Sequence, residues 1–120
     1  MSWKIVRLEL ARTQGYPEGS PEHAFLVRLP IGENGAVQAD LLKQPLMQPS
    51  VRRIWPGESE KTGVIIPKDD GWVFSYEPGD DDDEPLFRLN DHKLKMGDYL
   101  TIFEQGEALP FKVVCVEDAR

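Results

Sequence analysis

The stretch of sequence that decides the fold class lies in the middle of the chain. It reads Gly63-Val64-Ile65-Ile66-Pro67-Lys68-Asp69-Asp70-Gly71-Trp72-Val73-Phe74-Ser75-Tyr76. Both halves are rich in β-branched and aromatic residues, which favour extended strands. The Asp-Gly pair between them tolerates the positive φ angles of a tight turn. The stretch therefore predicts two antiparallel strands joined as a β-hairpin.

Strand patterns also dominate the rest of the sequence. Residues 6–10 alternate apolar and polar side chains, and residues 25–31 place an apolar side chain at every second position. Residues 99–104 and 111–116 flank a Gly-containing turn as another hairpin. Pro30 has no N–H to donate, so its strand is expected at a sheet edge or paired through its other side. Further short strands are expected at three places, which are residues 36–39 after the turn Asn34-Gly35, residues 51–55 and residues 86–89.

Residues 40–47 are the only plausible helical segment. Asp40 is a suitable N-cap, but Pro45 and Pro49 limit the segment to about one turn. About seven to nine short strands with one helical turn predict an all-β fold, a small barrel or a strongly coiled sheet. The barrel is preferred because several strands are apolar on both faces, and a flat open sheet would leave one face exposed.

Length and charge fit one small domain with an unusual loop. The chain has 120 residues and a formal net charge of −7. Neither a linker nor an internal repeat is evident, so residues 1–120 are expected to form one domain. Six of the 21 acids fall between Glu77 and Glu84, where no base occurs, and the other 15 nearly balance the 14 bases. Residues 77–85 are therefore expected to form an acidic, mobile loop.

The composition also indicates which partners and which cellular compartment to expect. The negative net charge argues against binding to nucleic acids or to anionic membranes, because proteins bind both mainly through Lys and Arg. The aromatic row Trp72, Phe74 and Tyr76 could stack bases, but it runs into the acidic loop and is better interpreted as a core face. With one cysteine, no signal-peptide pattern and no apolar run long enough to cross a membrane, the expectation is a cytoplasmic protein.

The strongest candidate for ligand binding is the run Arg52-Arg53-Ile54-Trp55-Pro56-Gly57. A guanidinium group binds carboxylates or phosphates through a bidentate fork, so Arg52, Arg53 and Trp55 could recognise an anionic group. Adjacent residues of an extended strand point to opposite sides, so only one arginine can face a given partner. The alternative is internal ion pairing with the protein's own acids, with Trp55 closing the core.

Consecutive acids provide a second candidate, a divalent-cation site. Its ligands would be Asp80, Asp81, Asp82, Asp83 and Glu84, since Ca²⁺ and Mg²⁺ prefer several oxygen ligands. The spacing of an EF-hand is absent, because the acids are consecutive and no glutamate follows at the twelfth position. A solvated loop between two strands is the alternative that this composition favours.

Histidine and cysteine give little support for catalysis. His92 follows Asp91 and could act with Arg53 on a phosphate or carboxylate substrate, but no nucleophile motif accompanies it. Cys115 alternates with Val113 and Phe111, which predicts a buried small apolar side chain. The histidines and the cysteine lack zinc-ligand spacing. Neither a catalytic residue nor a cofactor is assigned, and a non-enzyme is favoured.

The segment from Val51 to Val116 resembles a small uncharacterised bacterial protein family. The motifs that carry the resemblance are the Arg-Arg-Ile-Trp-Pro-Gly run, Gly71-Trp72-Val73-Phe74-Ser75-Tyr76, the acids before Pro85-Leu86-Phe87-Arg88-Leu89, and His92 with Met96-Gly97-Asp98-Tyr99. The resemblance implies a bacterial source and no mechanism. It also implies that His92, Gly97 and Tyr99 form one strand-turn-strand unit.

Three functions of different classes remain open from the sequence. The first is a non-catalytic binding module that recognises a protein partner or a small anionic ligand, with Arg52, Arg53, Trp55 and His92 as candidate contacts. The second is a small enzyme near Arg53 and His92, and the third is a cation-binding protein that uses residues 80–84. The oligomeric state is left open.

Overall fold

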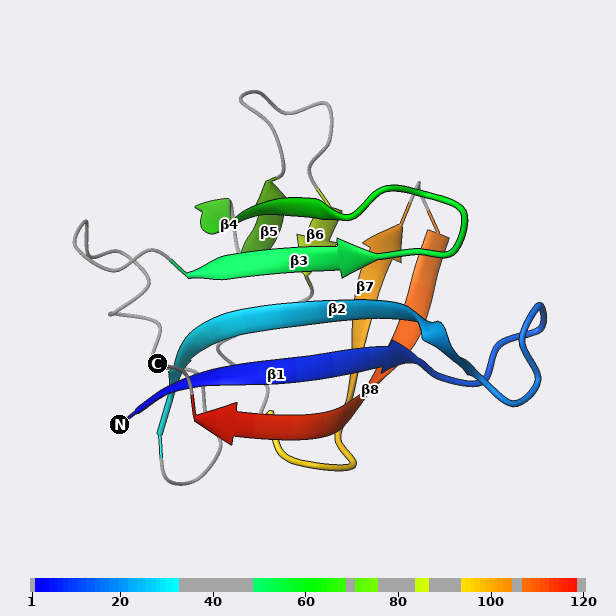
Figure 1. Cartoon of the computed structure of the whole chain (residues 1–120), viewed down its shortest axis with the longest axis horizontal. Helices are drawn as coiled ribbons and strands as arrows, with labels where there is room; N and C mark the ends of the chain where they lie inside the picture. Colours follow the sequence, from blue (N-terminus) through cyan, green and yellow to red (C-terminus); the bar gives the residue numbers. More distant parts are fainter. Residues whose placement is uncertain are drawn as a thin grey trace.

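The computed structural model describes residues 2–32, 49–68, 71–75, 84–86, 94–104 and 107–118. Every regular element in these ranges is a β-strand, which confirms the all-β prediction (Figure 1). The strands are β1 (Ser2–Leu10), β2 (Ser20–Ile31), β3 (Ser50–Ile54), β4 (Lys61–Lys68), β5 (Gly71–Ser75), β6 (Glu84–Leu86), β7 (Tyr99–Glu104) and β8 (Glu107–Asp118). The helical turn expected at 40–47 and the Asn34-Gly35 hairpin lie outside the described residues.

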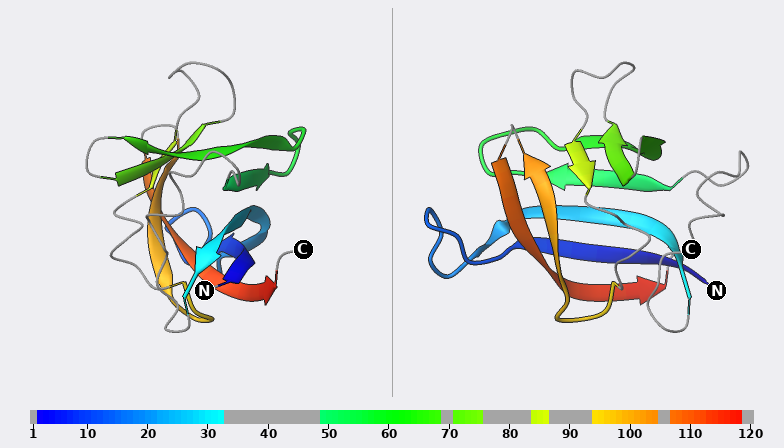
Figure 2. Two further views of the ribbon diagram at one scale, coloured as in Figure 1. Left: turned by 90° about the vertical axis from the view of Figure 1, so that its left-hand side faces the viewer. Right: turned by 180° about the vertical axis from the view of Figure 1, so that it is seen from behind.

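The strands form a closed antiparallel barrel in chain order, with β8 returning to pair with β1 (Figures 1 and 2). The long strand β8 makes this closure. Its first residues pair with β7 and its later residues pair with β1, so it crosses from one side of the barrel to the other. Closure pairs strands that would otherwise be sheet edges and gives the inner face a core.

Both hairpins expected in the second half of the chain are confirmed. Strands β4 and β5 pair out to Lys68 and Gly71, and β7 and β8 pair out to Glu104 and Glu107. Between them, Glu84–Leu86 pairs with β5 as strand β6. Glu84 and Pro85 were expected in the acidic loop, but the ladder with β5 extends to them. Residues 76–83 lie outside the described ranges.

Alternate residues of the strands face inward and make one core. An aromatic cluster lies within it, with the Phe25 ring centroid 5.2 Å from that of Phe74 and 5.1 Å from that of Phe111. Phe74 therefore belongs to the core, as its alternation indicated. The other apolar residues of this core in the described ranges are Val6, Leu8, Leu10, Val27, Leu29, Ile31, Val51, Ile65, Leu94, Leu100, Ile102 and Val113. Two-residue periodicity along the strands accounts for this pattern.

Strand β2 shows how a proline is accommodated in the barrel. Pro30 lies opposite Trp3 of β1, whereas the described residues of β3 reach only as far as Ser50, which lies opposite Arg28. Pro30 is thus paired on one side and lies beyond the ladder with β3. This is the second of the two arrangements expected from its missing N–H.

Cys115 corrects one sequence expectation. The ladder between β1 and β8 pairs Arg7 with Cys115 but Leu8 with Val113, so β8 contains one extra residue at this point. Such a bulge reverses the inside-outside alternation of the strand. Val113 and Val116 therefore contact the core, while Cys115 is half-buried and donates a hydrogen bond to Glu117. The prediction of a buried apolar cysteine was wrong because alternation was extended through the bulge.

No helix in the described part of the chain is long and apolar enough to cross a membrane.

Candidate functional site

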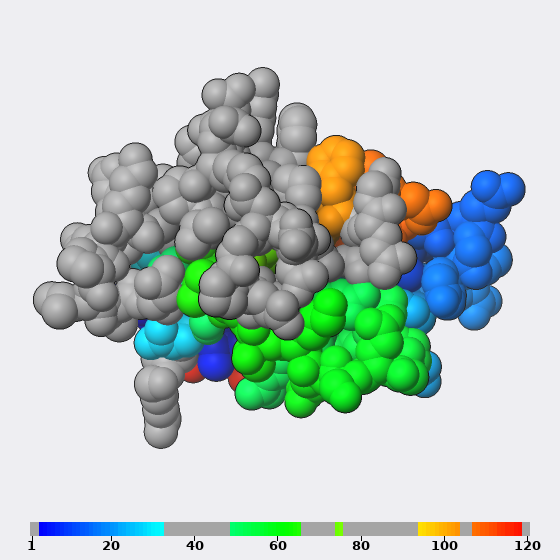
Figure 3. Space-filling model, turned by 90° about the horizontal axis from the view of Figure 1, so that it is seen from above, coloured from blue at the N-terminus to red at the C-terminus, as the bar shows by residue number. Residues whose placement is uncertain are grey.

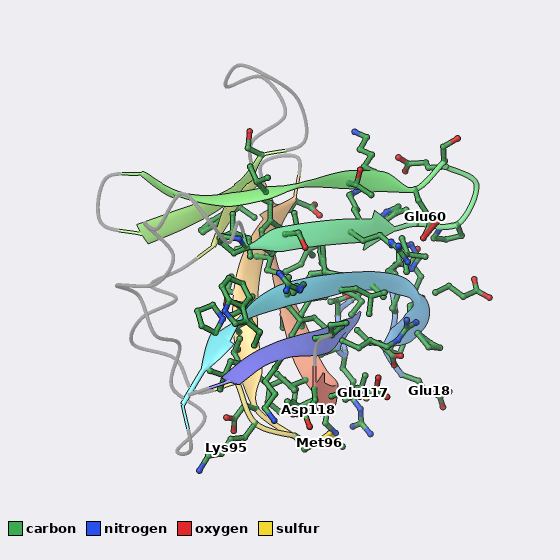
Figure 4. The ribbon with its side chains drawn as sticks, turned by 60° about the vertical axis from the view of Figure 1, so that its left-hand side comes forward. Glu18, Glu60, Lys95, Met96, Glu117 and Asp118 are labelled. Carbon is green, nitrogen blue, oxygen red and sulfur yellow. The ribbon has the colours of Figure 1, made fainter. Side chains whose placement is uncertain are left out.

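The two arginines of β3 lie on opposite faces of the barrel wall, as strand geometry requires. Arg52 is exposed and its Nε lies 3.8 Å from a carboxylate oxygen of Glu60. Arg53 is 2% exposed, and its Nη1 donates a hydrogen bond of 3.1 Å to Glu58 Oε1. Figure 4 shows Glu60 on the connection that follows β3. The two arginine side chains therefore cannot bind the same ligand.

Burial of Arg53 is made tolerable by a carboxylate and an aromatic ring. Its guanidinium carbon lies 4.1 Å from the ring centroid of Trp55, and its ion-pair partner Glu58 follows three residues after that tryptophan. A buried charge is costly unless it is paired and hydrogen-bonded, and a guanidinium over an aromatic face gains a further electrostatic attraction. Trp55 is half-buried against the core. The expected internal ion pair beside Trp55 is thus present for Arg53.

His23, for which the sequence pattern provides little support as a metal ligand or catalytic group, lies on the inner face beside Trp55. Its side chain is buried, with Nδ1 2.7 Å from Ser20 Oγ and Nε2 3.2 Å from the Tyr16 hydroxyl. The imidazole also meets Trp55 edge to face at a centroid distance of 4.7 Å. A signal was available in the sequence, because His23 continues the inward-facing alternation of Phe25, Val27 and Leu29.

A tight loop places Tyr16 over His23. Tyr16 and Thr13 exchange backbone hydrogen bonds, and the Gly19 N–H donates to the Tyr16 carbonyl. Gly19 has φ of 79°, and a Cβ there would lie 2.7 Å from the Leu10 carbonyl oxygen. Only glycine fits this combination of left-handed backbone and close approach. The glycine lets the chain turn back into β2 directly beside the end of β1.

These side chains line a groove of about 950 Å³ at one end of the barrel. Three segments that are distant in sequence form it: residues 13–16, residues 55–58 through Trp55 and Glu58, and residues 107–109. In Figures 1 and 3 the β1–β2 loop, the β3–β4 connection and the start of β8 lie at the same end of the molecule. Leu10 and His23 belong to the same lining. The groove thus brings aromatic rings and carboxylates together.

The geometry of His23 does not form a catalytic triad. A triad histidine uses one nitrogen for the nucleophile and the other for an orienting carboxylate, whereas here both nitrogens contact hydroxyl groups. A hydroxyl group can donate or accept a hydrogen bond, so both ring nitrogens can be satisfied by these two contacts. Ser20 is also buried. The arrangement fixes the ring and the Tyr16 side chain in place.

The remaining candidates lie apart from the groove or outside the description. His92 and Asp80, Asp81, Asp82 and Asp83 fall on residues that the structure does not describe, and of Glu84 only the strand backbone is described. Within the described ranges, no group of three or more His, Cys, Asp or Glu side chains is placed to hold a metal ion. A hydrogen bond to Glu117 and desolvation raise the pKa of Cys115, which lies on β8 and not in the groove lining.

Comparison with known proteins gives no indication of the function, so the structure is the basis for the functional argument. No family model, no curated protein and no solved structure matches this chain. The resemblance to an uncharacterised bacterial family therefore stays a prediction, and the functional argument depends on the groove at the end of the barrel.

Proposed function

We propose that this protein is a non-catalytic binding module that holds a segment of a protein partner in the groove beside Tyr16, His23 and Trp55. The observation that carries the proposal is the convergence of three distant segments on one aromatic-lined groove. Its volume falls within the range of ligand sites, which are typically about 300–1,000 Å³. Aromatic side chains that are already held in place lose little further entropy on binding.

An exposed rim supports a macromolecular partner over an enclosed small molecule. Tyr16 is 41% exposed, and Gln14, Glu58, Glu107 and Ala108 are also exposed. Small-molecule sites usually bury most of the ligand surface, which needs deeper walls. A side chain presented on a partner's backbone needs only a shallow recess with defined contacts. Tyrosine and tryptophan are also the residues on which interface energy is commonly concentrated.

The charges argue against the anionic ligand expected as one alternative. Arg53 is buried and already paired with Glu58, and Arg52 lies on the outer face near Glu60. Among the residues that the structure describes, the groove lining contains Glu58 and Glu107 but no lysine or arginine. An anion placed there would meet the Glu107 carboxylate and a Glu58 carboxylate that already pairs with Arg53, so it would find no cation left for it in the lining.

We expect the module to act in the bacterial cytoplasm, where a chain with one cysteine needs no disulfide.

The test is a nuclear magnetic resonance titration of the full, ¹⁵N-labelled chain. The probes are four pools of capped heptapeptides whose central residue is basic, acidic, apolar or neutral polar, with inorganic phosphate as the small-anion probe. We expect at least one peptide pool to shift the backbone amides of residues 13–16 and 107–109, and phosphate to leave them unchanged.

Matched variants decide whether the shifts report on the groove. Tyr16→Leu should weaken the shifts, whereas Tyr99→Leu should not, because Tyr99 is an exposed aromatic residue on β7 that is not part of the groove lining. The proposal fails if no peptide pool shifts these amides, if the shifts lie elsewhere, or if phosphate alone shifts them.

A further inference from the structure

The charges at the groove favour some partner segments over others, since Glu107 contributes a carboxylate beyond that of Glu58, which pairs with Arg53. Glu58 and Glu107 line it from opposite connections, one after β3 and one at the start of β8. Among the described residues, the lining contains neither lysine nor arginine. Carboxylates that line a recess attract cations and repel anions over distances near the Debye length, about 8–10 Å at ordinary salt concentrations.

The aromatic rings provide a second reason to favour a cation. The exposed Tyr16 ring lines the same groove as both carboxylates. A cation above an aromatic face is attracted by the negative potential of the ring, and a planar guanidinium can also stack on it. Carboxylate and ring together therefore make a complete recognition set for an arginine side chain, with the carboxylate accepting its N–H groups.

The protein already uses this chemistry beside the groove. Arg53 stacks on Trp55 and donates to Glu58, and on the outer wall Arg28 lies 4.7 Å above the ring of Trp3. The Arg53 contact also holds the Glu58 carboxylate in one position at the groove. A carboxylate that is fixed before binding does not have to be ordered by the ligand.

We propose that the groove binds an arginine side chain in an exposed segment of a protein partner, with Tyr16 as the stacking surface and Glu107 and Glu58 as the acceptors. This inference rests on the proposed binding function and names the chemistry of its ligand. An extended segment is the source that fits, because the exposed rim leaves room for the partner's backbone on both sides of the inserted side chain.

The test compares capped Gly-Ser-Gly-X-Gly-Ser-Gly peptides in which X is arginine, lysine, citrulline or glutamate, each titrated into the full ¹⁵N-labelled chain. Citrulline has the shape of arginine without its charge. We expect the arginine peptide to bind at least about tenfold more tightly than the citrulline peptide, and lysine to be intermediate. The amides of residues 13–16 and 107–109 should shift together, and raising the salt concentration should weaken binding.

Two glutamates of the same strand provide the matched control. Glu107 begins β8 at the groove, whereas Glu117 lies near the far end of β8, opposite Ile5. Glu107→Gln should weaken the arginine peptide about threefold to tenfold, and Glu117→Gln should change its affinity less than twofold. Both substitutions remove one negative charge, so they separate a local carboxylate from the net charge of −7.

Each possible outcome has a defined meaning. Equal weakening by Glu107→Gln and Glu117→Gln would overturn the proposal, because the attraction would then come from the overall charge. Equal binding of arginine and citrulline peptides in the groove would overturn the arginine assignment but leave the binding function intact. If the pooled peptides bind elsewhere or do not bind, the binding function itself fails. If free arginine binds as tightly as the arginine peptide, the ligand is not a segment of a protein partner, although the groove still recognises a guanidinium group.

Discussion

Removing the partner of the buried arginine should destabilise the barrel more than removing the partner of its exposed neighbour. The two substitutions are Glu58→Gln, which removes the carboxylate that lies 3.1 Å from Arg53 Nη1, and Glu60→Gln, which removes the carboxylate that lies 3.8 Å from Arg52 Nε. Both replace a carboxylate by an amide of similar size in the same connection. They differ in the environment of the arginine, whose side chain is 2% exposed for Arg53 and 52% exposed for Arg52.

The expected magnitude follows from how far each pair is removed from water. At a charge separation of about 4 Å, the Coulomb attraction is roughly 4 kcal/mol at an effective dielectric constant of 20 and about 1 kcal/mol in water. The Arg53–Glu58 pair lies between these limits, because Glu58 is 44% exposed. We therefore expect Glu58→Gln to lower the free energy of unfolding by about 1.5–2.5 kcal/mol. Glu60→Gln should lower it by less than about 0.5 kcal/mol, as is usual for exposed pairs.

The assay is urea unfolding followed by circular dichroism, with thermal unfolding as a second measurement. A chain of 120 residues has an unfolding entropy of roughly 0.25 kcal/mol per degree near its melting temperature. A loss of about 2 kcal/mol should therefore lower the Tm by about 8 °C. Glu60→Gln should shift it by no more than about 2 °C.

A double-mutant cycle isolates the interaction between the two groups. Arg53→Met keeps an unbranched side chain of comparable length in the core but removes the charge, so Glu58→Gln in that background should cost little. The reasoning is refuted if Glu58→Gln and Glu60→Gln are equally mild. It is also refuted if Glu58→Gln costs the same in the presence and absence of the Arg53 guanidinium.

Three further predictions concern other parts of the structure. Phe25→Ala should cost about 3–5 kcal/mol in urea unfolding, because Phe25 is fully buried and its ring contacts those of Phe74 and Phe111; a loss below about 1 kcal/mol would contradict its place in the core. Gly19→Ala should destabilise by about 2–4 kcal/mol, whereas Gly57→Ala should cost about 1 kcal/mol. Both glycines have positive φ, but only at Gly19 would a Cβ meet the Leu10 carbonyl oxygen, so similar losses would refute the close approach. Iodoacetamide at pH 8 should react faster with Cys115 in Glu117→Gln than in the original chain. The Cys115 thiol donates a hydrogen bond to the Glu117 carboxylate, which raises the pKa of Cys115 and lowers the thiolate fraction; an unchanged rate in a mass-spectrometric assay would contradict this contact.

Local patterns predicted much of the barrel because their causes are local. The strands expected on either side of the Asp-Gly pair form the β4–β5 ladder, and alternation places Val6, Leu8 and Leu10 in the core. The opposite orientation of Arg52 and Arg53 also follows from strand geometry alone. These features depend on residues within a few positions of one another, so the chain specifies them without reference to distant contacts.

The groove was not predicted, because its parts come from three distant segments. Nothing in the residues around Tyr16 indicates that Trp55 and Glu107 lie beside it, since their proximity follows from barrel closure. His23 could have been placed on the inner face by extending the alternation of Phe25 backward. Its contacts with Ser20 and Tyr16, in contrast, depend on how the loop turns back at Gly19.

The sequence by itself determined the strand content, the hairpins and the inward-facing residues, because strand propensity, turn chemistry and two-residue alternation act over short distances. Only the tertiary structure decided which strands close the barrel, where β8 bulges and which charges meet at the groove. Pairing between β1 and β8 depends on the fit of segments about 110 residues apart, as the register between Lys4 and Asp118 shows. One extra residue in that ladder turned Cys115 outward, and the same closure brought the start of β8, with Glu107, to the groove that Tyr16 and Trp55 line.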